Sequence, residues 1–373
     1  MTEPFKIAIS DEAIADLHTR LARTRWPREI TDGGWTYGTN LSYLRELCEY
    51  WAKGFDWRAQ EAALNRHEQF MEVVDGFRLH FVHAEGRGPA PLPLVLTHGW
   101  PSTIYELDRV IGPLSDPAAY GGDPADAFHV VVPSLPGYGF SEIPTVAGYG
   151  AARTAQLWDG LMSQLGYERY GAHGGDWGAL VTAHLGWRYP ERVVGIHRNV
   201  GGIQFASIEG MSDEARRERR ELWQTEESGY QGIQSTKPQT LSYGLTDSPA
   251  GLAGWIVEKW RSWSDCAGDV ESRFTKDDLL TTIAIYWFTE TIHSSTRFYY
   301  ESAHDEENRI DGHIDTPSGF AVFPGMGGSR ERAAEDCNLV HWSEFERGGH
   351  FAAFEEPDLV VEDLRTFFRP LRT

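Results

Sequence analysis

The chain has 373 residues, of which 41% are hydrophobic and 24% are charged. These proportions are ordinary for a soluble globular protein and argue against a disordered chain. The 34 basic and 55 acidic residues leave a formal net charge of −21. Because an acidic surface repels phosphate backbones, we expect no nucleic-acid partner.

The three cysteines, Cys48, Cys266 and Cys337, are odd in number and far apart. This pattern argues against a disulfide framework and a zinc site, and we expect neither a metal nor a cofactor. The N-terminus lacks the basic and apolar regions of a signal peptide, and no run reaches the ~18 apolar residues of a spanning helix. We therefore expect a soluble, cytoplasmic protein without a membrane anchor, and a homodimer is left open.

Residues 1–85 are expected to form an N-terminal region that straps the body of the protein. Residues 11–21 read as an amphipathic helix with Ser10 as its N-cap, and residues 41–51 read as another. The stretch TRWPREITDGGWTYG between them is rich in Trp and Arg. We assign this region to structure rather than to chemistry.

From about residue 77, short apolar strands alternate with helical segments, which predicts a parallel sheet covered on both faces. Residues 86–200 would form the first part of this core, and residues 201–312, which are helical and rich in Trp and Tyr, an inserted cap. The strand-like GFAVFP (319–324) would resume the sheet within residues 313–373, before a last helix at about 357–368. The strand candidates are FRLHFVHAEG, LPLVLTHGWP, FHVVVPSLPGYGFS, the start of RYGAHGGDWGALVTAHL, and RVVGIHRNV.

The segment Gly174-Gly175-Asp176-Trp177-Gly178 lies between a predicted strand and a predicted helix. It fits the G-x-nucleophile-x-G turn of hydrolases, in which small residues let strand and helix approach closely. A carboxylate needs no base to activate it and suits displacement at a saturated carbon. The product would be an ester of Asp176, which water must then cleave.

Cleavage of such an ester requires an oxyanion hole and a base for water. The turn His98-Gly99-Trp100-Pro101 ends an earlier strand, so the backbone N–H groups of Trp100 and Trp177 are candidates for the oxyanion hole. His350, in RGGHF before the last helix, is the candidate base. Together these features predict an α/β-hydrolase fold with a mostly parallel central sheet, helices on both faces, an inserted helical cap and an N-terminal strap.

The sequence resembles the microsomal-type epoxide hydrolase family over nearly its whole length. The N-terminal part is similar through FKIAISDEAIADLHTRLARTRWP and WTYGTNLSYLRELCEYW, and the catalytic segments through HGWP, GGDWG and RGGHFAAFEEPDL. SGYQGIQSTKPQT and FTKDDLLTTIAIYWFTETIHSSTRFYYE are similar to the cap of that family. We expect the chain to lack the N-terminal membrane anchor of that family.

The resemblance implies that two cap tyrosines, Tyr230 and Tyr299, hold the epoxide oxygen. A neutral phenol with a pKa near ~10 can both hydrogen-bond that oxygen and donate a proton to it. Tyr300 is the adjacent competitor for the second role. Neighbours on a helix point about 100° apart, so only one of the two should face the nucleophile.

The chain departs from the family where an acidic residue should orient the base, because Met326 stands at that place in FPGM. A thioether cannot accept a strong hydrogen bond from the imidazole. Glu331, Glu335 and Asp336 are alternative acids if the loop is remodelled, and Asn199 offers a carbonyl oxygen. The sequence does not choose among them.

The sequence therefore predicts an epoxide hydrolase that turns a small apolar or aryl epoxide and water into a vicinal diol. One alternative is a haloalkane-type dehalogenase of the same fold, which would also use Asp176 and bind halide with Trp177. The other is an inactive relative that only binds hydrophobic ligands. Detoxification, aromatic hydrocarbon catabolism and natural-product biosynthesis all stay open as roles.

If no other acid serves His350, ester release should be slower than ester formation, because the base acts in the second step. The alkyl-enzyme would then accumulate, and intact-protein mass spectrometry after mixing with an epoxide would detect it. Fast diol turnover without an adduct would contradict this expectation.

Overall fold

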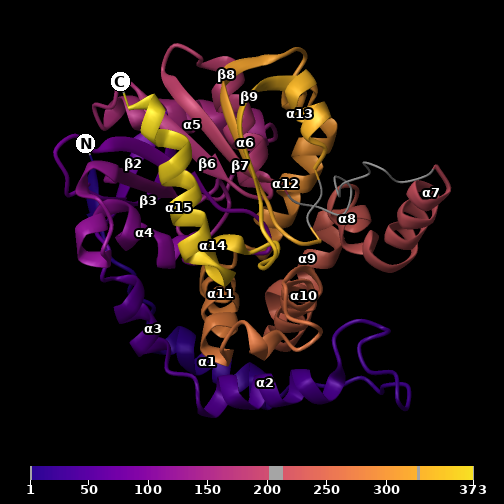
Figure 1. The fold of residues 1–373 in the computed structure, drawn as a ribbon. Helices are drawn as coiled ribbons and strands as arrows, with labels where there is room; N and C mark the ends of the chain where they lie inside the picture. Colours follow the sequence, from indigo (N-terminus) through magenta and orange to yellow (C-terminus); the bar gives the residue numbers. More distant parts are fainter. Residues whose placement is uncertain (1, 201–212, 326–327, 373) are drawn as a thin grey trace.

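The structure is a computed structural model and describes residues 2–200, 213–325 and 328–372. Nine strands in this part of the chain form one sheet with the order β1-β2-β3-β5-β4-β6-β7-β8-β9 (Figure 1). Their bounds are β1 Glu3–Phe5, β2 Gln69–Val74, β3 Phe77–Ala84, β4 Leu92–Thr97, β5 Phe128–Pro133, β6 Tyr170–Gly174, β7 Val193–Val200, β8 Ile314–Val322 and β9 Cys337–Glu344.

The sheet is antiparallel at its N-terminal edge and parallel elsewhere. The pairs β1/β2, β2/β3 and β3/β5 are antiparallel, and every pair from β5 to β9 along the sheet is parallel. Parallel strands end at the same edge, so the turns after β4 and β6 lie side by side, which brings the two predicted catalytic turns together. The predicted fold is confirmed.

Helices cover both faces of the sheet because its central strands are apolar on both sides. Along β4, Leu94 and Leu96 pack with α4 (Asp108–Ser115) and α15 (Pro357–Phe368), whereas Val95 faces the core that includes α5 (Ala151–Gln164) and α6 (Trp177–Arg188). The predicted final helix agrees with α15 at both ends.

Two strands differ from their expected limits. β2 was missed, although Asp75 and Gly76, with φ of 48° and 78°, make the two-residue turn that joins it to β3. β8 begins before the expected GFAVFP because Pro317 is accommodated at a register shift between Ile314 and Ser318.

The N-terminal region both joins the sheet and braces the cap. After β1, α1 (Asp11–Ala22, N-cap Ser10), α2 (Leu41–Lys53) and α3 (Trp57–Leu64) run along the cap end of the molecule (Figure 1). Tyr50 on α2 donates a hydrogen bond to Asp277 of the cap at 2.9 Å. The expected strap is therefore present, while β2 and β3 belong to the central sheet; the division at residue 85 stays a prediction.

The cap is helical, as predicted, and is inserted between β7 and β8. The expected cap residues 201–212 lie outside the described residues, as does Met326. The cap helices are α7 Asp213–Leu222, α8 Gly229–Gln234, α9 Pro238–Asp247, α10 Pro249–Trp263, α11 Lys276–Thr289 and α12 Ile292–His304.

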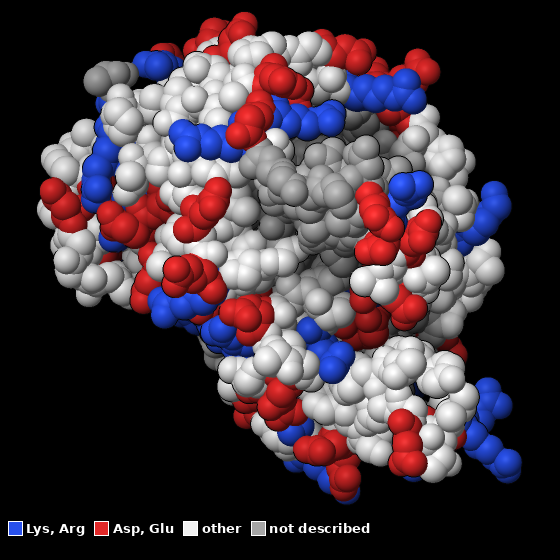
Figure 2. Space-filling model, turned by 45° about the vertical axis from the view of Figure 1, so that its right-hand side comes forward, with Lys and Arg blue, Asp and Glu red and all other residues white. Residues whose placement is uncertain are grey.

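No helix in the described part of the chain is long and apolar enough to cross a bilayer. Acidic and basic side chains are interspersed among uncharged residues on the face shown in Figure 2. The cytoplasmic location, the lack of a nucleic-acid partner and the homodimer stay predictions.

Candidate active site

The turn that carries Asp176 is strained and leaves no room for larger neighbours. β6 ends at Gly174, α6 begins at Trp177, and Asp176 between them has φ 50° and ψ −125°, a conformation that costs energy for a residue with a side chain. A Cβ on Gly174 would lie 2.4 Å from the backbone of Gly178, and one on Gly178 would lie 2.1 Å from the carbonyl oxygen of Thr97. The glycines are therefore required by strand–helix contact.

The Asp176 carboxylate is held from two sides. The backbone N–H of Trp100 donates to its Oδ1 at 2.9 Å, and Nε2 of His350 lies 3.5 Å from its Oδ2. A Cβ on Gly99 would lie 2.4 Å from Oδ1, so the turn after β4 approaches the carboxylate as closely as a glycine allows. The unpaired backbone N–H groups of the first turn of α6 also lie at this end of the helix, next to Asp176, and they favour a negative charge there.

His350 lies after β9 and is buried against the cap. Its side chain is 8% exposed, its backbone N–H donates to the carbonyl oxygen of Trp263 at 2.9 Å, and the two rings have centroids 4.8 Å apart. Trp263 is the last residue of α10, so the cap supplies one wall around His350.

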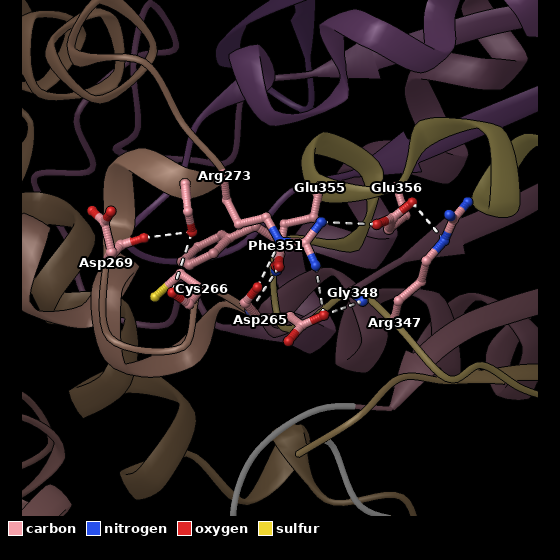
Figure 3. A network of polar contacts seen from close by, with 10 residues as sticks. Asp265, Cys266, Asp269, Arg273, Arg347, Gly348, Phe351, Glu355 and Glu356 are labelled. Atoms are coloured by element: carbon pink, nitrogen blue, oxygen red, sulfur yellow. Dashed lines mark hydrogen bonds and ion pairs between the residues drawn. The ribbon is translucent and has the colours of Figure 1, made fainter.

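A polar network ties the loop of His350 to this corner of the cap (Figure 3). The Glu355 carboxylate accepts hydrogen bonds from the backbone N–H groups of Phe351 at 3.0 Å and Asp265 at 2.8 Å. Arg273 pairs with Asp265 at 2.7 Å and with Glu356 at 3.1 Å. The loop and the cap therefore hold each other in register, and a loss of this network would free both.

Both predicted tyrosines come from the cap and lie in one aromatic cluster over the nucleophile turn. The ring of Tyr230, on α8, stacks on Trp100 with centroids 5.4 Å apart and an angle of 4°. The ring of Tyr299, on α12, meets Trp177 edge-on at 4.6 Å and Tyr230 at 5.9 Å. Tyr300 is 37% exposed and stacks on His304, so it points away from this cluster.

The phenols of the cluster are neutral proton donors. Burial raises the pKa of Tyr230 above its ordinary value, and the charge of Asp176 adds to the effect. Burial, followed by Tyr230 and Asp176, likewise raises the pKa of Tyr299. Both hydroxyl groups keep their protons at neutral pH and can donate a hydrogen bond to an oxygen that gains negative charge.

The charges around His350 favour its protonated form. Burial lowers the pKa of His350, but the hydrogen bond and charge of Asp176, together with the charges of Glu106 and Glu355, outweigh burial and raise it. Glu106 is buried and Glu355 is partly buried. Removal from water is the chief reason why the pKa of each carboxyl group rises to about 7. Two further carboxyl groups thus accompany the imidazole in addition to Asp176.

Sequence reasoning did not find Glu106 or Glu355. Glu355 lies in the same RGGHFAAFEE segment as His350, at the end of the short helix α14 (Ala352–Glu355), and this spacing is a signal that could have found it. Glu106 lies in the 3₁₀ turn Ile104–Leu107, which follows Trp100 and packs against α14. Only the folded chain brings that turn to His350.

The acid candidates expected from the sequence lie elsewhere. Glu331, Glu335 and Asp336 are exposed on α13 (Arg330–Asp336), and within the described ranges none of them makes a hydrogen bond or ion pair with His350. Asn199 is buried near Gly175, and its Oδ1 lacks a hydrogen-bond partner among the described residues. None of the four is therefore seen to contact His350.

One buried group could be compared with a metal site. His197 and His341 contact Asp363 at 2.8 and 2.7 Å, Ser343 donates to Asp363 at 2.6 Å, and His173 contacts His197 at 3.0 Å. These are hydrogen-bond distances, so protein donors already satisfy the carboxylate. The group links β6, β7, β9 and α15 and is part of the support beneath the nucleophile strand.

The chain has the fold of an α/β hydrolase, with Asp176 at the strand–helix turn where such hydrolases carry their nucleophile. A family model described as "Epoxide hydrolase N terminus" matches residues 2–107, and one described as "alpha/beta hydrolase fold" matches residues 93–248. A Stigmatella aurantiaca protein that is named as an epoxide hydrolase is 45% identical over 99% of this chain and 85% of its own length. Epoxide hydrolase 1 of Sus scrofa is 36% identical over 98% of this chain and 88% of its own length.

The solved structure of juvenile hormone epoxide hydrolase from Bombyx mori is similar with a TM-score of 0.87 and 30% identity, covering 100% of this chain and 94% of that one. The epoxide hydrolase of Aspergillus niger is similar with a TM-score of 0.86 and 30% identity, covering 100% and 97%. The chain belongs to the epoxide hydrolase family.

Proposed function

We propose that this epoxide hydrolase opens its substrate by attack of an Asp176 oxygen on an epoxide carbon. The observation that carries the proposal is the Asp176 carboxylate, which is held by the Trp100 N–H at 2.9 Å beneath two neutral cap phenols. As the new C–O bond to Asp176 forms, the ring C–O bond breaks. Tyr230 and Tyr299 hydrogen-bond the departing oxygen, and one of them supplies its proton.

In the second step, His350 takes a proton from water, and the hydroxide adds to the ester carbonyl of Asp176. The N–H groups of Trp100 and Trp177 hold the oxyanion, and collapse releases the diol and restores the carboxylate. One hydrogen of the water ends on the released hydroxyl, and the other restores the tyrosine. The 3.5 Å separation of Nε2 and Oδ2 supports this role, because it leaves His350 within reach of a water at the carboxyl carbon.

Glu106 and Glu355 are proposed to replace the acid that Met326 cannot supply. Their charges stabilise the imidazolium that forms as water is deprotonated, and the two backbone hydrogen bonds of Glu355 fix the turn after His350. Hydrolysis of the ester is then faster than it would be if no acid took the place of Met326.

The substrate is proposed to be a small apolar or aryl epoxide. The rings of Trp100, Tyr230, Trp263 and Tyr299 pack against one another beside the turn of Asp176, and they favour an apolar group next to the epoxide carbon.

A turnover panel of styrene oxide, fatty epoxides, polycyclic epoxides and 1-chlorobutane tests this function. We expect diols from epoxides and no chloride release. Asp176→Asn should abolish diol formation, and His350→Gln should leave an adduct on the peptide that contains Asp176, because formation of the ester does not need the base. Chloride release without diol formation, or normal turnover by Asp176→Asn, would overturn the proposal.

The proposed role of Glu106 predicts a shifted pH profile. The pKa of His350 is raised first by Asp176 and then by Glu106 and Glu355; once Asp176 is esterified and uncharged, the charge of Glu106 still raises it. Because the base must be neutral, ester hydrolysis should slow as the pH falls through the pKa that His350 has in the ester. Glu106→Gln removes one of the raising charges and should move the acid limb of the hydrolysis step to lower pH.

The step can be isolated by single-turnover kinetics from pH 5.5 to 9. Glu12→Gln, an exposed change of equal charge at the start of α1, is the control and should leave the limb in place. An unshifted limb in Glu106→Gln would show that Glu106 does not act on the base.

A further inference from the structure

The helix that carries Tyr230 depends on other elements for its position. α8 has six residues, which is too few to be stable alone. Two contacts join its ends to α10: Nζ of Lys259 pairs with Glu227, just before α8, at 2.9 Å, and Nε1 of Trp255 donates to Gln234 at 3.1 Å. α10 therefore helps to hold α8, and with it the Tyr230 ring, in place.

Lys259 is an unusual residue for the interior of the cap. Its side chain is 6% exposed, and its ammonium group pairs with both Glu227 and Glu258, the latter at 2.8 Å. A buried ammonium group is costly unless it is paired, and here two carboxylates pair with it. The mechanism described above gives this cation no role.

The ammonium group lies over two rings of the catalytic cluster. Its Nζ is 5.0 Å from the centroid of the Tyr230 ring and 5.7 Å from that of Trp263, both within the range of a cation–π interaction. Trp263 in turn packs on His350. The acid residues near Tyr230, namely Asp176, Glu227 and Glu258, all disfavour a negative charge on its oxygen, and Lys259 lies among them with the opposite charge.

We propose that Lys259 is a positioning residue for ring opening, which anchors α8 through Glu227 and keeps a positive charge against the Tyr230 ring. Negative charge grows on Tyr230 as its proton moves to the epoxide oxygen, so the cation interacts more strongly with the transition state than with the ground state. The inference rests on the proposed function, since it needs Tyr230 to act as an acid. In this proposal the two residues act in different steps. Lys259 assists formation of the ester, and His350 assists its hydrolysis.

The test is single-turnover kinetics of Lys259→Met, which keeps an apolar chain of similar length and removes the charge. Acid-quenched mass spectrometry with styrene oxide measures adduct formation and decay as separate rates. We expect adduct formation to slow by roughly tenfold, with decay little changed. In a Tyr230→Phe background the same substitution should have no further effect on adduct formation, because the cation acts through the phenol.

Glu258→Gln is the matched control. It removes a partner of Lys259 that does not hold α8, and it should leave adduct formation nearly unchanged. Glu227→Gln keeps the cation but loosens α8, and it should slow adduct formation only when Tyr230 is present. It also serves as the second variant if Lys259→Met does not fold by circular dichroism.

Equal slowing of both steps by Lys259→Met and Glu227→Gln, or full additivity with Tyr230→Phe, would overturn the role of Lys259. A wild-type enzyme that makes diol without any adduct would instead overturn the proposed function, so the two failures are distinguishable.

Discussion

The backbone of Asp176 is the constraint on which the rest of the site depends. Its φ of 50° places the carboxylate at the start of α6 and in contact with the turn after β4, where the Trp100 N–H and Gly99 meet it. This geometry requires strand and helix to touch at Gly174 and Gly178, and the parallel sheet supplies that contact. The strain is supported by the buried core on both faces of the sheet.

Above this rigid edge, the cap completes the site from one direction and the loop of His350 from another. The two are joined at Asp265, Arg273 and Glu355, so partly buried polar contacts fix their relative position (Figure 3). In the proposed mechanism, formation of the ester removes the charge of Asp176 and thereby lowers the pKa of His350. The first step therefore favours the neutral imidazole that the second step needs.

Much of the site could be predicted because local sequence determines it. Local backbone requirements mark the glycines around Asp176 and the glycine loop before His350. The tyrosine segments of the cap are marked by their resemblance to the family. Glu106 and Lys259 could not be predicted, because a single charged residue in a helical segment reads as solvent-facing until the fold buries it. The Asp75-Gly76 pair is a hairpin-turn signal from which β2 could have been predicted. The start of β8 could not be predicted in the same way, because Pro317 disfavours a strand in the sequence pattern.

The central claim is that the oxygen added to the epoxide, which becomes the second hydroxyl of the diol, comes from Asp176 rather than from water. A single turnover in ¹⁸O-labelled water, with enzyme in excess over epoxide, tests it directly. The account predicts an unlabelled diol and one ¹⁸O atom in the peptide that contains Asp176. A labelled diol in the first turnover, with an unlabelled Asp176 peptide, would show that water attacks the epoxide directly and would contradict the account.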